Sequence, residues 1–333
     1  MHVAIIGAAG MIGRKLAERI ADTGKIGGAS VNALTLLDVH TPTVAEHFAG
    51  TRTALAADLS NPDTATQLVA QRPDVIVHLA AIVSSEAEAE LEKGYRVNLD
   101  GTRALFEALR HAEGYTPRLI YASSLAVFGA PFPVRIPDDF QLTPQSSYGT
   151  QKAMGELLLD DYSRRGFLDG VGIRFPTICI RPGKPNKAAS SFYSSILREP
   201  LNGQPAILPV GEDVRHWFAS PRAAVGFIEH GATLDTAQLG ARRSMTMPGV
   251  SATVADQIEA LRVVAGDNAV ALIRREHDPV IARIVESWPR DFDTARANQM
   301  GFRAETSFRE IIEVYLEDEM GGQGEHDKTA SLQ

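Results

Sequence analysis

The chain has 333 residues, of which 44% are hydrophobic and 22% are charged, and its formal charge is −8. This composition excludes a disordered or fibrous chain, and the length allows one large α/β domain with a smaller lobe, or two domains. Because acidic residues outnumber basic ones and no basic run is present, we expect no nucleic acid partner.

The N-terminal half alternates short apolar runs with amphipathic stretches. Two of the apolar runs, Val75–Val77 and Leu119–Tyr121, show no polar alternation, which is typical of strands covered by helices on both faces. The pattern predicts an α/β fold with a doubly wound parallel sheet, a Rossmann fold. The predicted strands are His2–Ile6, Ala33–Asp38, Asp74–His78 and Arg118–Ala122, and the predicted helices are Met11–Ala21, Asn61–Ala70 and Glu86–His111.

A helix at Ser146–Arg165 and a strand at Val171–Ile180 complete the predicted first domain, residues 1–180. Beyond it the sequence becomes richer in Pro and Gly, so we place a smaller C-terminal α/β substrate lobe at residues 181–320, with some elements returning to the first domain. Residues 321–333 are polar and predict a disordered tail. The lobe is expected to contain helices Ser190–Leu201, Pro221–Ala232, Val254–Ala265, Pro279–Glu286 and Ser307–Glu319, and strands Ala206–Leu208 and Ser244–Met247.

Cysteine and histidine usage sets the expected compartment and metal content. Cys179 is the single cysteine of the sequence, which excludes an intrachain disulfide and a cysteine-based metal cluster. The nine histidines show no paired spacing, so we expect no metal. No apolar run reaches the about 18 residues of a membrane span, and the first residues resemble a strand rather than a signal segment. We therefore expect a cytoplasmic protein that binds no membrane.

A glycine-rich turn follows the first predicted strand and opens the first predicted helix. Gly7, Gly10 and Gly13 have the spacing Gly-x-x-Gly-x-x-Gly. Such glycines let the backbone approach a pyrophosphate, and the helix N-terminus offers it free N–H groups. We predict that a dinucleotide contacts this turn, including Met11 and Ile12; the alternative is a turn that binds no ligand.

Asp38 ends the second predicted strand, where a carboxylate accepts hydrogen bonds from both adenosine ribose hydroxyls and repels a 2′-phosphate. This position predicts NAD rather than NADP, and the alternative is a turn residue at the strand end. Asp58-Leu59 and Leu79-Ala80-Ala81 stand at later strand ends where the rest of the cofactor is expected. Asn98, in a predicted helix, either contacts this site or serves helix packing.

Tyr148 and Lys152 are four residues apart in a predicted helix, so their side chains share one face. The ammonium can then lie beside both the phenol and the cofactor ribose. Ser124 follows a predicted strand at the carboxyl edge of the sheet, where ligands of doubly wound sheets bind. We predict Ser124, Tyr148 and Lys152 as catalytic residues; the alternative for Ser124 is a turn residue.

In this order the motifs resemble the extended short-chain dehydrogenases/reductases, the NAD-dependent epimerase/dehydratase family, over residues 1 to about 318. The resemblance implies that Ser124 orients the substrate and that Tyr148 is the acid/base. It implies that Lys152 lowers the pKa of the phenol and holds the nicotinamide ribose. It also implies cofactor contact at Pro176, and it favours a homodimer through the helices Glu86–His111 and Ser146–Arg165.

One departure from the family pattern concerns the substrate. Nucleotide-sugar epimerases usually have Arg-x-x-Asn after the sixth strand, whereas this chain has Thr177 in the place of that Asn. The stretch Arg181–Gln204 is similar to family members that oxidise D-erythronate, a four-carbon sugar acid, at C2. The resemblance therefore implies NAD-dependent oxidation of the C2 hydroxyl of a small sugar acid.

A small acid needs a cation for its carboxylate, and Arg181, Lys184 and Arg215 are candidates. Each of the three is alternatively a surface or structural charge. The predicted substrate contacts are Ser84, Ser124, Thr177, Arg181, Ser190 and Arg215.

Two other functions compete with this interpretation. A nucleotide-sugar 4-epimerase shares the fold and the Ser-Tyr-Lys group, and keeps its NAD bound through the cycle. A non-catalytic NAD-binding protein often lacks the Tyr or the Lys, and both are present in this sequence.

Overall fold

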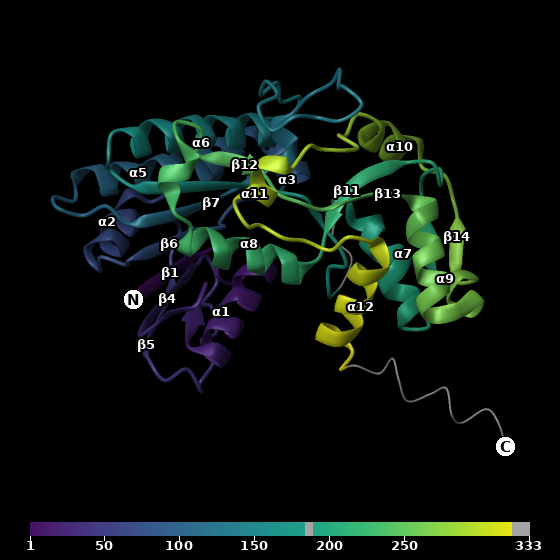
Figure 1. Cartoon of the computed structure of the whole chain (residues 1–333), viewed down its shortest axis with the longest axis horizontal. Helices are drawn as coiled ribbons and strands as arrows, with labels where there is room; N and C mark the ends of the chain where they lie inside the picture. Colours follow the sequence, from purple (N-terminus) through teal and green to yellow (C-terminus); the bar gives the residue numbers. More distant parts are fainter. Residues whose placement is uncertain (184–188, 322–333) are drawn as a thin grey trace. The chain divides into compact units, whose positions relative to one another are not determined.

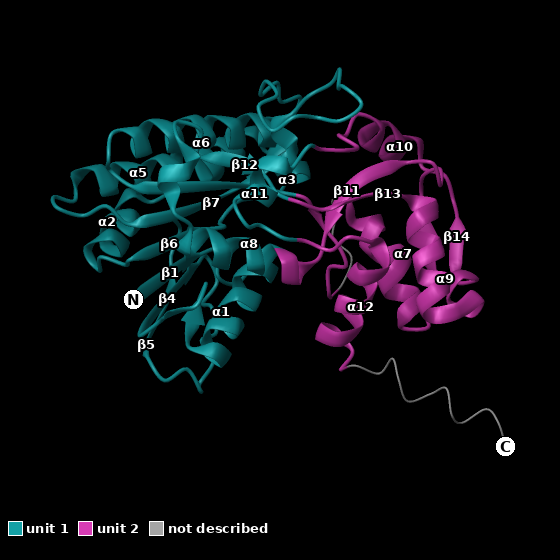
Figure 2. Cartoon of the chain, viewed as in Figure 1, with its two compact units in different colours: residues 1–175, 224–247, 293–303 teal, residues 176–223, 248–292, 304–333 magenta. Residues whose placement is uncertain are grey.

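The structure is a computed structural model that describes residues 1–183 and 189–321. It divides the chain into two compact units, which Figure 2 shows in different colours. Unit 1 comprises Met1–Phe175, Ala224–Met247 and Asp293–Arg303, and unit 2 comprises Pro176–Ala223, Pro248–Phe292 and Ala304–Gln333. Lys184 and, apart from Gly321, the predicted tail at 321–333 lie outside the described residues.

Unit 1 contains a seven-stranded sheet in the order β12-β8-β7-β6-β1-β4-β5, in which every neighbouring pair is parallel. The central strands are apolar and almost fully buried, as the sequence predicted. The doubly wound parallel sheet is therefore confirmed. Its strands are β1 (His2–Ile6), β4 (Ala33–Asp38), β5 (Thr51–Ala56), β6 (Val75–His78), β7 (Arg118–Ser124), β8 (Asp169–Phe175) and β12 (Ser244–Thr246).

Helices cover both faces of this sheet, with α2, α5 and α6 on one face and α1 and α8 on the other (Figure 1). On the first face, Phe106 and Leu159 pack against Ile76, Leu119 and their neighbours in one buried cluster. A short hairpin of β2 (Lys25–Ile26) and β3 (Ala29–Ser30) follows α1. The helices are α1 (Met11–Thr23), α2 (Pro62–Ala70), α5 (Gly101–His111), α6 (Ser147–Arg164), α8 (Pro221–Thr233), whose first three residues belong to unit 2, and α11 (Ala295–Gln299).

The predicted long helix Glu86–His111 is wrong, because the backbone is broken there into several pieces. The pieces are α3 (Ser84–Ala89), α4 (Leu91–Gly94), the π-helical segment η1 (Tyr95–Asp100) and α5. Glu90 leaves the helical region with φ −122° and ψ 74°. Gly94 packs so closely on α6 that a Cβ would lie 2.7 Å from Nε2 of Gln151. Tertiary packing thus overrides the periodicity of this segment.

The predicted single strand Val171–Ile180 is also wrong. Pro176, which has no N–H for a strand ladder, separates β8 from β9 (Thr177–Ile178). β8 lies in the sheet of unit 1, whereas β9 pairs with β11 in unit 2. The predicted lobe strand at Ser244–Met247 corresponds to β12, which pairs with β8 in unit 1.

Unit 2 has its own apolar core, in which side chains of α7, α9 and α12 pack around Phe218 of β11. The sheet order β13-β11-β9 has one antiparallel and one parallel pair, and β10 pairs with β14 in parallel. Gly266, with φ +79°, interrupts α9 after the predicted helix end at Ala265. Besides β9, unit 2 contains α7 (Ser191–Leu201), β10 (Ala206–Leu208), β11 (Arg215–Ala219), β13 (Val250–Thr253), α9 (Val254–Val270), β14 (Ile273–Arg275), α10 (Pro279–Glu286) and α12 (Phe308–Glu319).

Within the described residues, we find no helix with the length and apolar character that crossing a membrane requires.

Candidate active site

The glycine turn joins β1 to α1 at the carboxyl edge of the sheet of unit 1. Gly7 has φ +89°, and a Cβ there would lie 2.6 Å from the backbone N of Ala80. A Cβ on Gly13 would lie 2.3 Å from the carbonyl oxygen of Gly7, so neither position accepts a side chain. Gly10 is the N-cap of α1; no side chain caps the helix, and its first turn contains no acidic residue. Uncapped N–H groups in a side-chain-free turn fit a pyrophosphate.

Asp38 lies beside this turn because β4 pairs with β1. Its Oδ2 accepts a hydrogen bond of 2.9 Å from the N–H of Ala9, and Oδ1 accepts one of 3.3 Å from the N–H of His40. The carboxylate is half-buried and stays fixed at the end of β4. This position fits the adenosine ribose of NAD.

The other predicted cofactor residues divide into three groups. Met11 and Ile12 begin α1 and are half-buried, as is the segment 79–81 directly after β6. Asp58 is exposed and accepts the N–H of Ser60 at 2.8 Å in a turn after β5. Leu59 packs in the core. The structure therefore brings the glycine turn, Asp38 and segment 79–81 to one sheet edge and places the side chain of Leu59 in the core.

Asn98 links the loop after β6 to the helix α6. Its buried amide accepts the N–H of Ile82 at 2.9 Å and donates to the carbonyl of Ile82 at 3.2 Å. It also donates to Oε1 of Gln151 at 2.8 Å. The π-helical turn η1 provides this orientation, and such turns often occur at functional sites. The side chain of Asn98 thus joins the loop after β6 to α6, the helix that carries Tyr148 and Lys152.

Tyr148 and Ser124 are brought together where α6 begins. Ser146 caps α6 by accepting the N–H of Gly149 at 3.1 Å. A Cβ on Gly149 would lie 2.1 Å from the carbonyl oxygen of Ala126, in the 3₁₀ turn η2 (Leu125–Val127) that follows β7. This close approach allows the hydrogen bond between the side chains of Ser124 and Tyr148.

Lys152 lies one turn after Tyr148 on α6 and is 3% exposed. Its Nζ donates to the carbonyl of Ala122 at 2.7 Å and lies 5.7 Å from the ring centre of Tyr148. Burial lowers the pKa of Lys152 to about 8, and the charge of Glu156 acts against this shift. Burial raises the pKa of Tyr148 to about 12, and the hydrogen bond with Ser124 acts against this shift. In the chain without cofactor, the pKa of Tyr148 is therefore not lowered as the sequence analysis expected.

A buried ion pair beneath the site was not singled out from the sequence. Glu156 is 2% exposed and pairs with Arg174, whose Nη2 lies 2.7 Å from Oε2 of Glu156. Glu156 follows Lys152 by four residues, so helical spacing was a signal that could have identified it. Arg174 lies on β8, 18 residues after Glu156, and no helical spacing relates the two.

Four predicted substrate residues belong to unit 2, and Thr177 is bonded to a buried histidine. The Oγ1 of Thr177 and Nε2 of His216 are 2.7 Å apart, and Nδ1 of His216 lies 2.8 Å from the carbonyl oxygen of Pro289. Because a carbonyl only accepts, Nδ1 carries the proton and Thr177 donates to Nε2. Burial lowers the pKa of His216 to about 4. Thr177 therefore retains only acceptor capacity for a ligand.

The two candidate arginines of unit 2 differ in their partners. Arg215 is exposed and lies 3.6 Å from the carboxylate of Asp256. Arg181 is half-buried, and among the described residues its guanidinium has no carboxylate partner. Burial and the neighbouring charge of Arg198 lower the pKa of Arg181. A half-buried arginine without a carboxylate partner is suited to bind an anion.

Among the described residues, we find no hydrogen bond that joins the remaining predicted residues to Ser124, Tyr148 or Lys152. Ser190 precedes α7 without a side-chain cap bond, Ser84 is exposed at the start of α3, and Pro176 is buried between β8 and β9. In the described part of the chain, we find no group of three or more His, Cys, Asp or Glu able to hold a metal ion.

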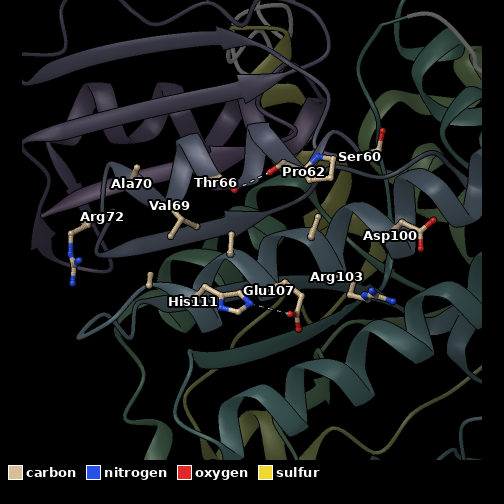
Figure 3. A pocket seen from close by; sticks show the side chains of 13 residues that line it. Ser60, Pro62, Thr66, Val69, Ala70, Arg72, Asp100, Arg103, Glu107 and His111 are labelled. Atoms are coloured by element: carbon tan, nitrogen blue, oxygen red, sulfur yellow. Dashed lines mark hydrogen bonds and ion pairs between the residues drawn. The ribbon is translucent and has the colours of Figure 1, made fainter.

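A separate groove of about 660 Å³ lies between α2 and α5 in unit 1 (Figure 3). Its lining includes Arg72, Arg103, Glu107 and His111, and Glu107 lies 3.7 Å from His111. None of the residues predicted from the sequence for the active site lines it.

The chain is similar to known proteins over most of its length. The NAD dependent epimerase/dehydratase family matches residues 3–222. The chain is 45% identical to D-erythronate dehydrogenase from Cupriavidus necator, over 96% of this chain and 98% of the relative. It is 41% identical to D-erythronate dehydrogenase from Haemophilus influenzae, over 96% and 100%.

A solved structure is also similar to this chain over nearly its full length. It is the crystal structure of the nucleoside-diphosphate-sugar epimerase from Agrobacterium tumefaciens, with 62% identity and a TM-score of 0.95. The match covers 97% of this chain and 95% of that one.

Proposed function

Because the chain belongs to the NAD dependent epimerase/dehydratase family and is an NAD-dependent oxidoreductase, we propose that it oxidises the C2 hydroxyl of a small sugar acid, D-erythronate. The product is 2-dehydro-D-erythronate. The main support for this proposal is the group formed by Ser124, Tyr148 and Lys152 at the carboxyl edge of the sheet of unit 1. The glycine turn and Asp38 at the same edge fit NAD. The two dehydrogenases that cover the full chain support the choice of substrate.

The residues of unit 1 have distinct roles in this proposal. Tyr148, as phenolate, takes the proton of the C2 hydroxyl. Lys152 is the cation within reach of that phenolate, and its hydrogen bond to Ala122 keeps it in place. The hydroxyl of Ser124 lies beside the phenol of Tyr148. In the proposal, Ser124 therefore holds the substrate oxygen that gives its proton to Tyr148. NAD, when bound, supplies the hydride acceptor.

We assign the substrate carboxylate to Arg181. A sugar acid carries one negative charge, and an arginine binds a carboxylate through two parallel hydrogen bonds. Arg181 is half-buried without a carboxylate partner among the described residues, whereas Arg215 already faces Asp256. Thr177, as an acceptor, is suited to a substrate hydroxyl. Ser84 and Ser190 stay predictions from the sequence.

The test is a set of four-carbon sugar acids incubated with NAD, with absorbance read at the NADH band. The proposal expects NADH in proportion to the D-erythronate consumed and less with its stereoisomers. No NADH from any four-carbon acid would contradict it.

The second candidate function is a nucleotide-sugar 4-epimerase, which the 62% identity to the Agrobacterium tumefaciens protein favours. Such an enzyme oxidises and re-reduces the same carbon. Incubation with a UDP-sugar would then interconvert the sugar without net NADH, and this outcome separates the two candidates.

We also propose a homodimer and a cytoplasmic location. Leu157 and Met154 on α6 are 63% and 39% exposed, and Leu91 on α4 is 54% exposed. Large apolar side chains on neighbouring helices of unit 1 are typical of a self-association surface. Sedimentation velocity should give the mass of two chains. The single buried cysteine supports the cytoplasm.

A further inference from the structure

We propose that Glu156 is a positioning residue of the active site, which anchors the end of β7 to α6 and places one negative charge beside Lys152. The inference rests on the proposed function, since Glu156 acts through Lys152, Ser124 and Tyr148. Nothing in the proposed chemistry requires Glu156 to touch substrate or cofactor.

The carboxylate of Glu156 is fully engaged. Oε1 accepts from the Oγ of Ser123 at 2.5 Å and from Nε of Arg174 at 2.9 Å, and Oε2 accepts from Nη2 of Arg174 at 2.7 Å. Arg174 is held in turn by the carbonyl of Asp138 at 2.9 Å, and the carboxylate of Asp138 lies 2.9 Å from Arg296. A buried carboxylate with these partners cannot reorient freely.

Ser123 is the link between this ion pair and the reacting groups. It stands between Ala122, whose carbonyl accepts the Nζ of Lys152, and Ser124, which bonds to Tyr148. The hydrogen bond from Ser123 to Glu156 therefore fixes the short segment that positions both catalytic side chains of α6.

Charge provides the second contribution. The groups around Lys152 are His78 on β6, Tyr121 on β7, and Tyr148 and Glu156 on α6. Burial lowers the pKa of Lys152 to about 8, and the carboxylate of Glu156 raises it. Glu156 thus favours the ammonium form of Lys152, which is the form that stabilises a phenolate.

Glu156 has its own charged neighbours. These are Arg174 on β8, whose charge balances the carboxylate, and Asp160 and Lys152 on α6. The charge of Glu156 also contributes to the raised pKa of Tyr121 on β7. Glu156→Gln keeps the shape of the side chain and an acceptor for Ser123, but it leaves the positive charge of Arg174 with Asp138, 3.8 Å away, as its remaining close carboxylate. Loss of the Glu156 carboxylate and the less balanced charge of Arg174 both lower the pKa of Lys152.

The experiment is a pH titration of the protein labelled with ¹³Cε-lysine, followed by NMR. The sequence has seven lysines, and Lys152→Ala assigns the signal. We expect the Lys152 pKa to fall by about one unit in Glu156→Gln. Asp161→Asn, which removes an exposed charge from the same helix, is the matched control and should leave it unchanged. An unchanged Lys152 pKa in Glu156→Gln would overturn the charge role.

The anchoring role is tested by Ser123→Ala, which keeps every charge and stays informative should Glu156→Gln not fold. Its kcat should fall about tenfold at constant KM for NAD, with the Lys152 pKa near that of the wild type. A wild-type kcat would overturn anchoring. The NMR titration needs no turnover, so absence of D-erythronate oxidation would refute the proposed function while leaving the inference on Glu156 testable.

Discussion

Each unit buries a histidine beside at least one aromatic ring, and the two histidines are bonded differently. In unit 1, Nε2 of His78 lies 2.8 Å from Oγ1 of Thr102, while its buried Nδ1 has no hydrogen-bond partner among the described residues. In unit 2, both ring nitrogens of His216 are bonded. Burial lowers both pKa values, to about 3 for His78, where the charge of Lys152 contributes, and to about 4 for His216.

The difference shows how each unit uses its buried polar groups. In unit 1, Lys152, Glu156 and Arg174 keep charges in a low-dielectric interior, where electrostatic effects on proton transfer are large. Around His216 in unit 2, a neutral imidazole joins β11 to the chain near Pro289. We therefore expect substitutions near Lys152 in unit 1 to change the chemical step, and substitutions of Arg181 and His216 in unit 2 to change binding or stability.

The largest expected effect is that of Tyr148→Phe. The ring stays in place but the proton acceptor is lost, so kcat should fall by about 10²-fold or more while NAD still binds. Steady-state kinetics and fluorescence titration with NADH measure the two quantities. Phe167→Leu, at another ring of unit 1, serves as control, and near-normal turnover of Tyr148→Phe would exclude Tyr148 as the base.

Arg181→Ala tests the binding role assigned to unit 2. Loss of a charge-assisted bidentate contact should raise KM for the sugar acid about 10- to 100-fold and leave KM for NAD unchanged. Arg215→Ala, in which a solvent-exposed arginine is removed, should change it by less than about twofold. The reverse ranking would show that the carboxylate binds near Arg215.

Asp38→Ala concerns the cofactor end of unit 1. Without the carboxylate, repulsion of a 2′-phosphate ends and a ribose contact is lost, so the preference for NAD over NADP should shrink about tenfold. Comparison of kcat/KM with both cofactors measures this, and Asp22→Asn, which removes an exposed carboxylate from α1, is the control. A wild-type enzyme that prefers NADP would contradict the assignment.

The smallest effect is a pH-dependent loss of stability caused by His216. Its pKa is about 4 in the folded protein and near 6.5 in the unfolded chain, so between these values the unfolded chain binds the extra proton. Stability is therefore complete above about pH 6.5 and falls as the pH drops to 4. His216→Phe should unfold at a lower temperature than the wild type at pH 7.5. The further decrease of its unfolding temperature between pH 7.5 and pH 5 should be smaller than that of the wild type.

His111→Gln is the control for this measurement, since its imidazole is 68% exposed. Equal acid sensitivity of wild type and His216→Phe would mean that other groups carry the effect.

The sequence predicted most of the sheet of unit 1 and the site residues that depend on local spacing. The strands β1 and β4 were predicted to the residue, because apolar runs and turn glycines are local signals. Tyr148 and Lys152 were predicted to share a helix face, which the structure confirms. It missed β11 and β13, whose pairing in unit 2 joins segments far apart in the chain.

What the sequence determined by itself is therefore what short-range physics specifies: the glycine turn, the acidic end of β4 and the alternation of strands and helices in the N-terminal half. Only the tertiary structure decided the break at Glu90, the return of β12 to the first sheet and the contact of Glu156 with Arg174. The physical reason is that burial and long-range pairing depend on which segments meet in space. Hydrogen bonds and charges in a low-dielectric interior then select a backbone that periodicity does not specify.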